Sequence, residues 1–193
     1  EQAASQSGTW YEVKNHMGSL TGCMGQSLEE MGIQVAVYEE NFLTHYMYEN
    51  IATDCECYFQ AEDLTQLRAV KEPYELEATR KASQIADQAF ADLLPYIKPG
   101  VTEKELAARL ESNMLLLGSE EKSFTTIAAS GKRSAMPHGT ASTKVVEKGD
   151  FLTFDFGAVW EGYHSDMTVG SVRMTRSPGS GDRIRYCDLM PYR

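Results

Sequence analysis

The 193-residue sequence has few cysteines and no long apolar run. Its four cysteines form neither a dense disulfide framework nor paired CxxC motifs, so we expect a reducing environment. No apolar stretch approaches the roughly 20 residues that cross a bilayer. The first residues also lack the cationic start and apolar core of a secretory signal. These absences predict a cytoplasmic protein with no membrane partner.

Basic side chains are nearly missing from the first third of the chain. Residues 1–66 carry eleven acidic side chains and one basic side chain, Lys14, which argues against nucleic acid as a partner. Residues 67–169 are closer to balance, with fifteen acidic and twelve basic side chains. Residues 170–193 carry five arginines, two aspartates and no lysine. The composition therefore predicts three segments with these boundaries, the last an unassigned tail.

Several common catalytic and binding motifs are also absent. The Gly131–Ser134 segment lacks the earlier glycine of a phosphate-binding loop. The Gly162–Asp166 segment lacks the closing glycine of a GxSxG nucleophile elbow. Cys55 and Cys57 have no second pair with which to hold a structural zinc ion.

Helical periodicity is strongest in the middle of the chain. Pro73 suits a first helical turn, and apolar residues at three- and four-residue steps predict a helix to about Leu94. Thr102 and Glu105 have the spacing of a capping box, which predicts a second helix ending near Gly118. Upstream, we expect no clear element in residues 1–27, a helix end at 28–32, a strand at 33–38 and a helix at 42–50.

The pattern becomes extended after the second helix. We expect a strand at 124–130, a loop at 131–139, and one long strand at 151–160. Glu161-Gly162 predicts a two-residue turn, after which the chain returns as a strand over 163–169. Helices followed by strands make the expected fold class α+β.

The predicted hairpin brings two carboxylates together. If Trp160 pairs with Tyr163, then Asp166 lies opposite Gly157, on the same face as Asp155. Such diagonal neighbours have Cα atoms about 7–8 Å apart. The absent side chain of Gly157 would leave space between them. The two acids either share a divalent cation or form an ordinary solvated face, and the pattern alone leaves both open.

Two histidines lie near this region. His164 shares the face of the two aspartates, as a ligand or as an ordinary exposed histidine. His138 lies in a Pro-His-Gly loop, where it serves either as a proton carrier and donor or as a turn residue.

An ordered set of short motifs adds a family resemblance. They are LRAVKEPYE at 67–75, IKPGVTE at 97–103, AMPHG at 135–139, EKGD at 147–150, TFDFGA at 153–158 and GYHSDMT at 162–168. The set resembles the Xaa-Pro aminopeptidase and prolidase branch of the pita-bread metallopeptidases, which includes methionine aminopeptidases and creatinase. The resemblance implies that residues 67–169 are the N-terminal half of a pita-bread catalytic domain. It also implies that residues 1–66 are the end of a creatinase-like N-terminal α/β domain.

The resemblance further implies a site and a reaction. Asp155 and Asp166 match two metal ligands of the family, and His138 matches the histidine that contacts substrate. The implied cofactor is a pair of divalent metal ions, with manganese the first choice and cobalt or zinc the alternatives. The implied activity releases the N-terminal residue from peptides with proline second, and a homo-oligomer is expected.

The end of the chain departs from the family pattern. The family's site also uses a histidine and two glutamates further along, but no histidine follows His164 and no glutamate follows Glu161. We therefore expect this chain to be incomplete and inactive alone, with residues 170–193 out of frame. Prolidase activity and a non-catalytic peptide-binding role are the alternatives.

Overall fold

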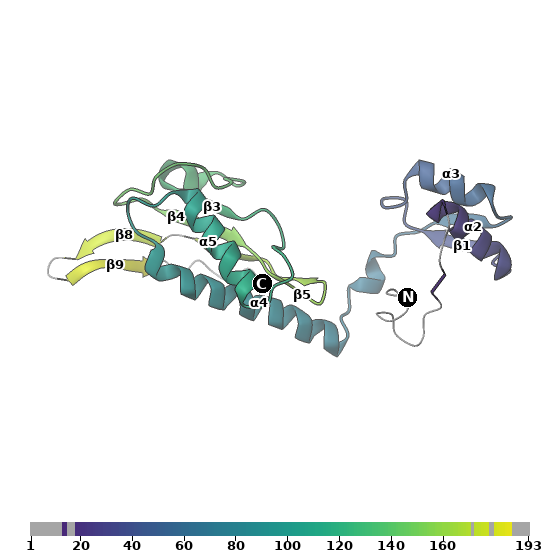
Figure 1. The fold of residues 1–193 in the computed structure, drawn as a ribbon, viewed down its shortest axis with the longest axis horizontal. Coiled ribbons are helices and arrows are strands. Elements are labelled where there is room, and N and C mark those ends of the chain that lie inside the picture. The colour runs from purple at the N-terminus through teal and green to yellow at the C-terminus, as the bar shows by residue number, and fades with distance from the viewer. Residues whose placement is uncertain (1–12, 15–17, 171, 178–179, 187–193) are drawn as a thin grey trace. The chain divides into compact units, whose positions relative to one another are not determined.

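The computed structural model describes residues 13–14, 18–170, 172–177 and 180–186, and from residue 170 on it describes the backbone only (Figure 1). The chain divides into two compact units, Glu1–Val70 and Lys71–Arg193. No helix in the described ranges has the length and apolarity needed to cross a membrane.

The first unit is a small α/β arrangement. Its elements are α2 (Leu20–Glu30), β1 (Val35–Tyr38), α3 (His45–Thr53), β2 (Tyr58–Ala61) and the 3₁₀ helix η1 (Thr65–Arg68). Strand β1 pairs with β2 in parallel. The rings of Tyr38, Tyr48 and Phe59 pack together, with the Tyr48 and Phe59 centroids 5.4 Å apart. The expected helix end, strand and second helix are confirmed, with shifted boundaries.

We expected no helix or strand before residue 28, but helix α2 already begins at Leu20, so that prediction is wrong for residues 20–27. Helix α2 begins at Leu20 because the Ser19 side chain accepts a hydrogen bond from Gly22 N at 3.2 Å. Glycines within α2 weaken its sequence signal. A Cβ at Gly25 would lie 2.6 Å from the Ile51 carbonyl oxygen, so the close approach of α3 requires this glycine. Residues 1–12 and 15–17 lie outside the described residues.

The second unit contains the two long helices and a three-stranded sheet. Its first elements are α4 (Pro73–Leu93), η2 (Leu94–Tyr96), α5 (Glu103–Leu116), β3 (Ile127–Ser130) and η3 (Gly131–Ala135). The strands that follow are β4 (Leu152–Phe156), β5 (Val159–Trp160), β6 (Tyr163–His164) and β7 (Met167–Gly170). Antiparallel pairing gives the sheet order β3-β4-β7.

Both predicted long helices are confirmed. Glu75 reaches back to the backbone of Glu72 at the start of α4, and the Thr102–Glu105 capping box opens α5. The helices bury Phe90, Leu93, Leu110 and Met114 in a core that also contains Phe154 and Phe156 of β4. Phe90 packs against both β4 rings, with centroids 5.4 Å and 5.5 Å away. This core fixes which face of β4 is turned away from the helices.

Three strand predictions need correction. Strand β3 begins at Ile127, three residues later than expected. The predicted strand at 151–160 is two strands, β4 and β5, and the predicted returning strand at 163–169 is also two, β6 and β7. The turn is confirmed, because Trp160 pairs with Tyr163 and both Glu161 and Gly162 have positive φ. The chain then forms an antiparallel pair, β8 (Val172–Ser177) and β9 (Ser180–Tyr186), where we expected no assignable element. Residues 171, 178–179 and 187–193 of the predicted tail lie outside the described residues.

Candidate functional site

Asp155 lies on the face of β4 opposite the buried phenylalanines. Strand residues alternate in direction, so burial of Phe154 and Phe156 in the core turns Asp155 away from it. Asp155 pairs with Thr168 of β7, whose hydroxyl donates a hydrogen bond to Asp155 Oδ1 at 3.0 Å. The hydroxyl thereby holds the Asp155 carboxylate in one orientation.

Strand β4 ends at Phe156, and side-chain hydroxyls accept backbone hydrogen bonds in the residues that follow it. The buried Ser165 hydroxyl accepts a hydrogen bond from Ala158 N at 2.9 Å, and Ser119 Oγ accepts one from Val159 N at 2.9 Å. Ser165 Oγ also lies 3.3 Å from the Ala82 carbonyl oxygen of α4. Ser165 therefore fastens the segment just before Asp166 to both the neighbouring strand and a helix.

Gly157 is required directly after β4 because the returning backbone lies close to it. A Cβ at Gly157 would lie 1.9 Å from the Ser165 carbonyl oxygen and 2.8 Å from the Ser123 Cβ. The backbone of the returning strand therefore excludes a side chain there, and the predicted space between the two carboxylates stays a prediction.

Asp166 lies within interaction range of Asp155. Asp166 is exposed overall, but partial burial of its carboxyl raises the pKa above its usual value, and the negative charge of Asp155 and a hydrogen bond with it raise that pKa further. The pair therefore has the electrostatics of two carboxylates that compete for one proton or share one cation. The structure brings these two predicted residues together.

The loop that contains His138 borders the same region. A hollow of about 250 Å³ is lined by Met136, Pro137, Asp155, Thr168 and neighbouring residues. His138 itself is exposed, and its imidazole makes no hydrogen bond to another residue in the described part of the chain. The structure thus brings the loop to Asp155 without placing the His138 ring against either aspartate.

His164 has a partner of its own. Its Nδ1 lies 3.0 Å from the Ser123 hydroxyl, and its backbone pairs with Val159. This arrangement fits an exposed hairpin histidine with an anchored ring.

The aspartates fit a divalent cation in part. Carboxylate oxygens are ligands that magnesium, manganese and similar hard cations accept. Among the described residues, no cluster of three or more histidine, cysteine, aspartate or glutamate side chains could hold a metal ion. The described residues therefore supply two candidate ligands, with Thr168 orienting one of them.

The hydrogen bond from Thr168 to Asp155 was not predicted from the sequence. The predicted register contains the necessary signal, because it places Thr168 directly opposite Asp155. Sequence reasoning identified the two acids but not the hydroxyl that fixes one of them.

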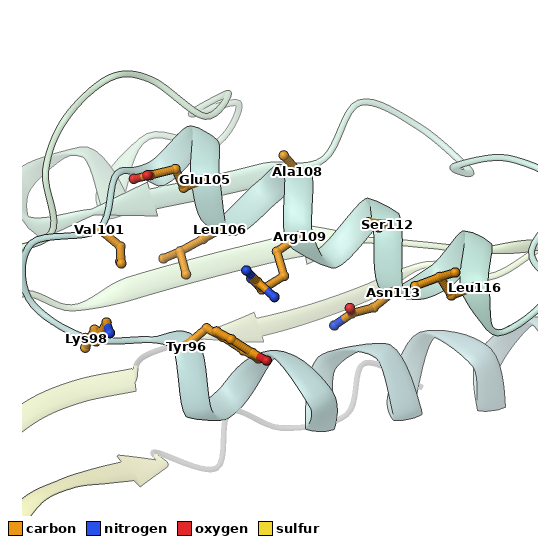
Figure 2. Close-up of a pocket in the computed structure, with 10 residues that line it drawn as sticks. All are labelled: Tyr96, Lys98, Val101, Glu105, Leu106, Ala108, Arg109, Ser112, Asn113 and Leu116. Atoms are coloured by element: carbon orange, nitrogen blue, oxygen red, sulfur yellow. The ribbon is translucent and has the colours of Figure 1, made fainter.

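A larger groove lies along α5, where this helix faces Tyr96 and the segment that joins α4 to α5 (Figure 2). It has a volume of about 590 Å³, and the Arg109 guanidinium lies 3.7 Å from the Tyr96 ring centroid beside it. Its lining contains one carboxylate, Glu105, which accepts hydrogen bonds from Thr102. A groove with one occupied carboxylate lacks the paired acids of the β4–β7 region, so the smaller hollow is the better candidate site.

Comparison with known proteins adds independent information. The sequence pattern of metallopeptidase family M24 matches residues 77–177. The uncharacterized peptidase YqhT of Bacillus subtilis is 39% identical over 161 residues, which cover 82% of this chain and 46% of that protein.

Two solved structures have the same fold over most of this chain. The Xaa-Pro dipeptidase from Bacillus anthracis matches with a TM-score of 0.80 and 40% identity, over 86% of this chain and 48% of that one. The X-Pro aminopeptidase from Thermotoga maritima matches with a TM-score of 0.77 and 37% identity, over 86% of this chain and 47% of that one. The chain thus spans about half the length of the relatives that it matches.

Proposed function

Because this chain belongs to metallopeptidase family M24, we propose that it forms part of a metal-dependent Xaa-Pro aminopeptidase. The substrate would be a peptide with proline in second position, and the reaction would release the N-terminal residue. The observation that carries the proposal is the strand register, in which Asp155 of β4 pairs with Thr168 of β7, two residues after Asp166. The raised pKa of Asp166, caused in part by the charge of Asp155, agrees with this placement. The α+β fold and its match to about half of each related structure support it.

Each side chain has a proposed role. Asp155 and Asp166 would hold divalent cations, with manganese the first choice and cobalt or zinc the alternatives. Bound cations would lower the pKa of a water molecule and polarise the scissile carbonyl. Thr168 would keep Asp155 oriented through its hydrogen bond. His138 would contact the substrate from the exposed loop that borders the hollow.

Prolidase activity is the second candidate. One matched structure is named an Xaa-Pro dipeptidase and the other an X-Pro aminopeptidase, so the names favour neither substrate length. A non-catalytic, peptide-binding role is the third candidate, because the described residues supply only two candidate ligands. Self-association, a cytoplasmic location and the creatinase-like assignment of residues 1–66 stay predictions.

Metal binding tests the two aspartates directly. Isothermal titration of Mn²⁺ into the 193-residue chain should give weak binding, because two carboxylates leave most coordination positions to water. Asp155→Asn and Asp166→Asn should each weaken binding by about tenfold or more, because the loss of even an outer-shell partner of a metal ligand costs about that much. Asp87→Asn, an exposed change on α4, is the matched control and should match wild type. If all three variants bound Mn²⁺ with the same affinity, the two aspartates would not be metal ligands.

Cleavage assays separate the three candidates. Ala-Pro-Ala, Ala-Pro and Ala-Ala-Ala would be incubated with Mn²⁺ and either this chain or the product of its full gene. We expect no cleavage by this chain alone, and cleavage of Ala-Pro-Ala in preference to the other two by the gene product. Preference for Ala-Pro would establish prolidase activity instead. A gene product that binds Mn²⁺ but cleaves none of them would favour the non-catalytic role.

A further inference from the structure

Glu103 is a fully buried carboxylate outside the proposed metal site. It lies in the first turn of α5 and is 1% exposed. A carboxylate so deeply buried is costly unless hydrogen bonds and a cation compensate it. The groups that donate hydrogen bonds to Glu103 therefore identify the segments that this carboxylate holds in place.

Five donors surround the Glu103 carboxylate. Ser130 donates to Oε1 from its backbone N at 2.7 Å and from its hydroxyl at 2.9 Å. Ser142 donates to Oε2 from its backbone N at 3.0 Å and from its hydroxyl at 2.6 Å. Arg133 Nε completes the set at 3.1 Å from Oε2. Glu103 thus joins the end of β3, the 3₁₀ helix η3 and the segment after His138.

A second ion pair continues from the same serine. Lys144 Nζ donates to Ser130 Oγ at 3.0 Å and to Asp150 Oδ2 at 2.6 Å. Asp150 also accepts a hydrogen bond from Glu147 N at 2.9 Å, just before β4. The network therefore fastens both the beginning and the end of the chain between β3 and β4.

Arg133 bridges the two ends of the segment that contains His138, within the chain between β3 and β4. While its Nε contacts Glu103, its Nη2 donates to the Thr140 carbonyl oxygen at 2.7 Å. Residues 133–140 are thereby held as a small closed loop. Met136 and Pro137 within that loop line the hollow beside Asp155.

We propose that Glu103 is a positioning residue for the candidate active site, which holds the 131–144 loop, with His138, beside Asp155. This inference rests on the proposed function for the role of the loop. Glu103 acts through Ser130, Arg133 and Ser142 and touches neither aspartate. An apolar side chain would fill the same buried volume, but it could not accept five hydrogen bonds from three separate segments.

Glu103→Gln tests the positioning role, and Glu105→Gln is its matched control. Glu105 lies two residues further along α5 and, among the described residues, its carboxylate accepts hydrogen bonds from Thr102 in the capping box alone. The amide replaces one acceptor oxygen of Glu103 with a donor, so amide hydrogen exchange across residues 131–144 should accelerate at least tenfold. The NMR resonance of the His138 ring should also shift. Glu105→Gln should leave both readouts at wild-type values.

A metal readout separates this inference from the proposed function. The aspartates lie on and beside β4 and β7, so Glu103→Gln should leave Mn²⁺ affinity within about twofold of wild type. The Mn²⁺-induced broadening of the His138 ring signal should nevertheless decrease, because the loop moves relative to the bound ion. Unchanged loop exchange and His138 signals, or the same change in Glu105→Gln, would overturn the positioning role. Wild-type protein that binds no Mn²⁺ would overturn the proposed function, and the exchange rates would still decide whether Glu103 holds the loop.

Arg133→Lys covers the case in which Glu103→Gln does not fold. Arg133 is about one-third exposed, and lysine keeps the charge while losing the two-pronged contact to Glu103 and Thr140. Exchange within residues 133–140 should accelerate several-fold. The exposed neighbour Lys132, changed to alanine, should give wild-type rates. Equal rates in both variants would contradict the inference.

Discussion

Tyr163 and Glu75 are joined by a hydrogen bond across 88 residues of sequence, with Tyr163 Oη donating to Glu75 Oε1 at 2.9 Å. The same carboxylate accepts from Glu72 N at 2.7 Å and so caps α4. The bond to Glu75 raises the pKa of the Tyr163 phenol well above its usual value. One side chain thus fixes both the start of a helix and the hairpin that leads to Asp166.

Tyr163→Phe should loosen this hairpin. Loss of the Tyr163 hydroxyl removes the hydrogen bond that joins the hairpin to Glu75. The amides of residues 159–164 should therefore exchange several-fold faster in hydrogen-exchange NMR. Global stability should change little, because the bond is near the surface. Tyr46→Phe, at a side chain 75% exposed in the first unit, is the control. Unchanged exchange in Tyr163→Phe would show that the turn holds the hairpin without Glu75.

Ser165→Ala should destabilise the second unit. The change leaves the buried Ala158 N without its 2.9 Å acceptor. An unsatisfied buried donor costs about 1–3 kcal/mol in the free energy of unfolding, measurable by urea denaturation. Ser112→Ala on the exposed side of α5 should stay within about 0.5 kcal/mol of wild type. A loss in Ser165→Ala no larger than the control would mean that water satisfies Ala158.

Gly157→Ala should be among the most damaging single changes in this region. The new Cβ would collide with the Ser165 carbonyl oxygen at 1.9 Å, and backbone cannot move aside as a flexible side chain can. We expect a loss of roughly 3 kcal/mol or more in urea denaturation. Gly162→Ala in the adjacent turn meets no atom within 4 Å and should cost only about 1–2 kcal/mol, from its φ of 75°. A smaller loss at Gly157 than at Gly162 would refute this account of the close approach between Gly157 and Ser165.

Asp155→Asn should slightly stabilise the metal-free protein. The change removes the repulsion between Asp155 and Asp166, while the amide oxygen can still accept from Thr168. In EDTA, the Tm from differential scanning calorimetry should rise by about 1–3 °C, a small shift because the pair is partly solvated. Asp87→Asn should leave the Tm unchanged. A lower Tm in Asp155→Asn would indicate that Asp155 stabilises the fold through its charge.

Glu103 should contribute to the acid sensitivity of the second unit. Burial alone would raise its pKa, but the hydrogen bonds from Ser142 and Ser130 outweigh burial and lower it. A carboxyl whose pKa is lower in the folded state stabilises the fold above its unfolded-state pKa. That stabilisation is lost as pH falls through the folded-state pKa.

The stability of Glu103→Gln should therefore depend less on pH in the acid range. At pH 7 the variant should lose about 3 kcal/mol, because a buried charge pair with Arg133 is broken. The difference from wild type should shrink as the pH is lowered below about 4, where the unfolded-state carboxyl becomes protonated. Urea denaturation at several pH values measures this difference in the free energy of unfolding. A constant difference across that range would show that the charge of Glu103 is not what stabilises the fold.

The sequence by itself determined the local elements of the second unit. Helices α4 and α5 were predictable because apolar periodicity and capping boxes are local signals, and both act within a few residues. The hairpin register was predictable because the Glu161-Gly162 turn fixes which residues pair. From that register, Asp155 and Asp166 could be placed on one face, and the family motifs suggested a metal site there.

Tertiary structure decided what depends on contacts between distant segments. At the break between β4 and β5, the hydroxyls of Ser119 and Ser165 accept backbone hydrogen bonds, and no local pattern marks either serine for this role. The start of α2 was hidden by glycines whose need appears only when α3 packs against them. Glu103 looked like an ordinary first-turn helix residue, since a favourable interaction with the helix dipole explains an exposed glutamate there. Its five donors come from residues 27 to 39 positions away, so only the folded chain shows that this carboxylate holds the loop beside Asp155.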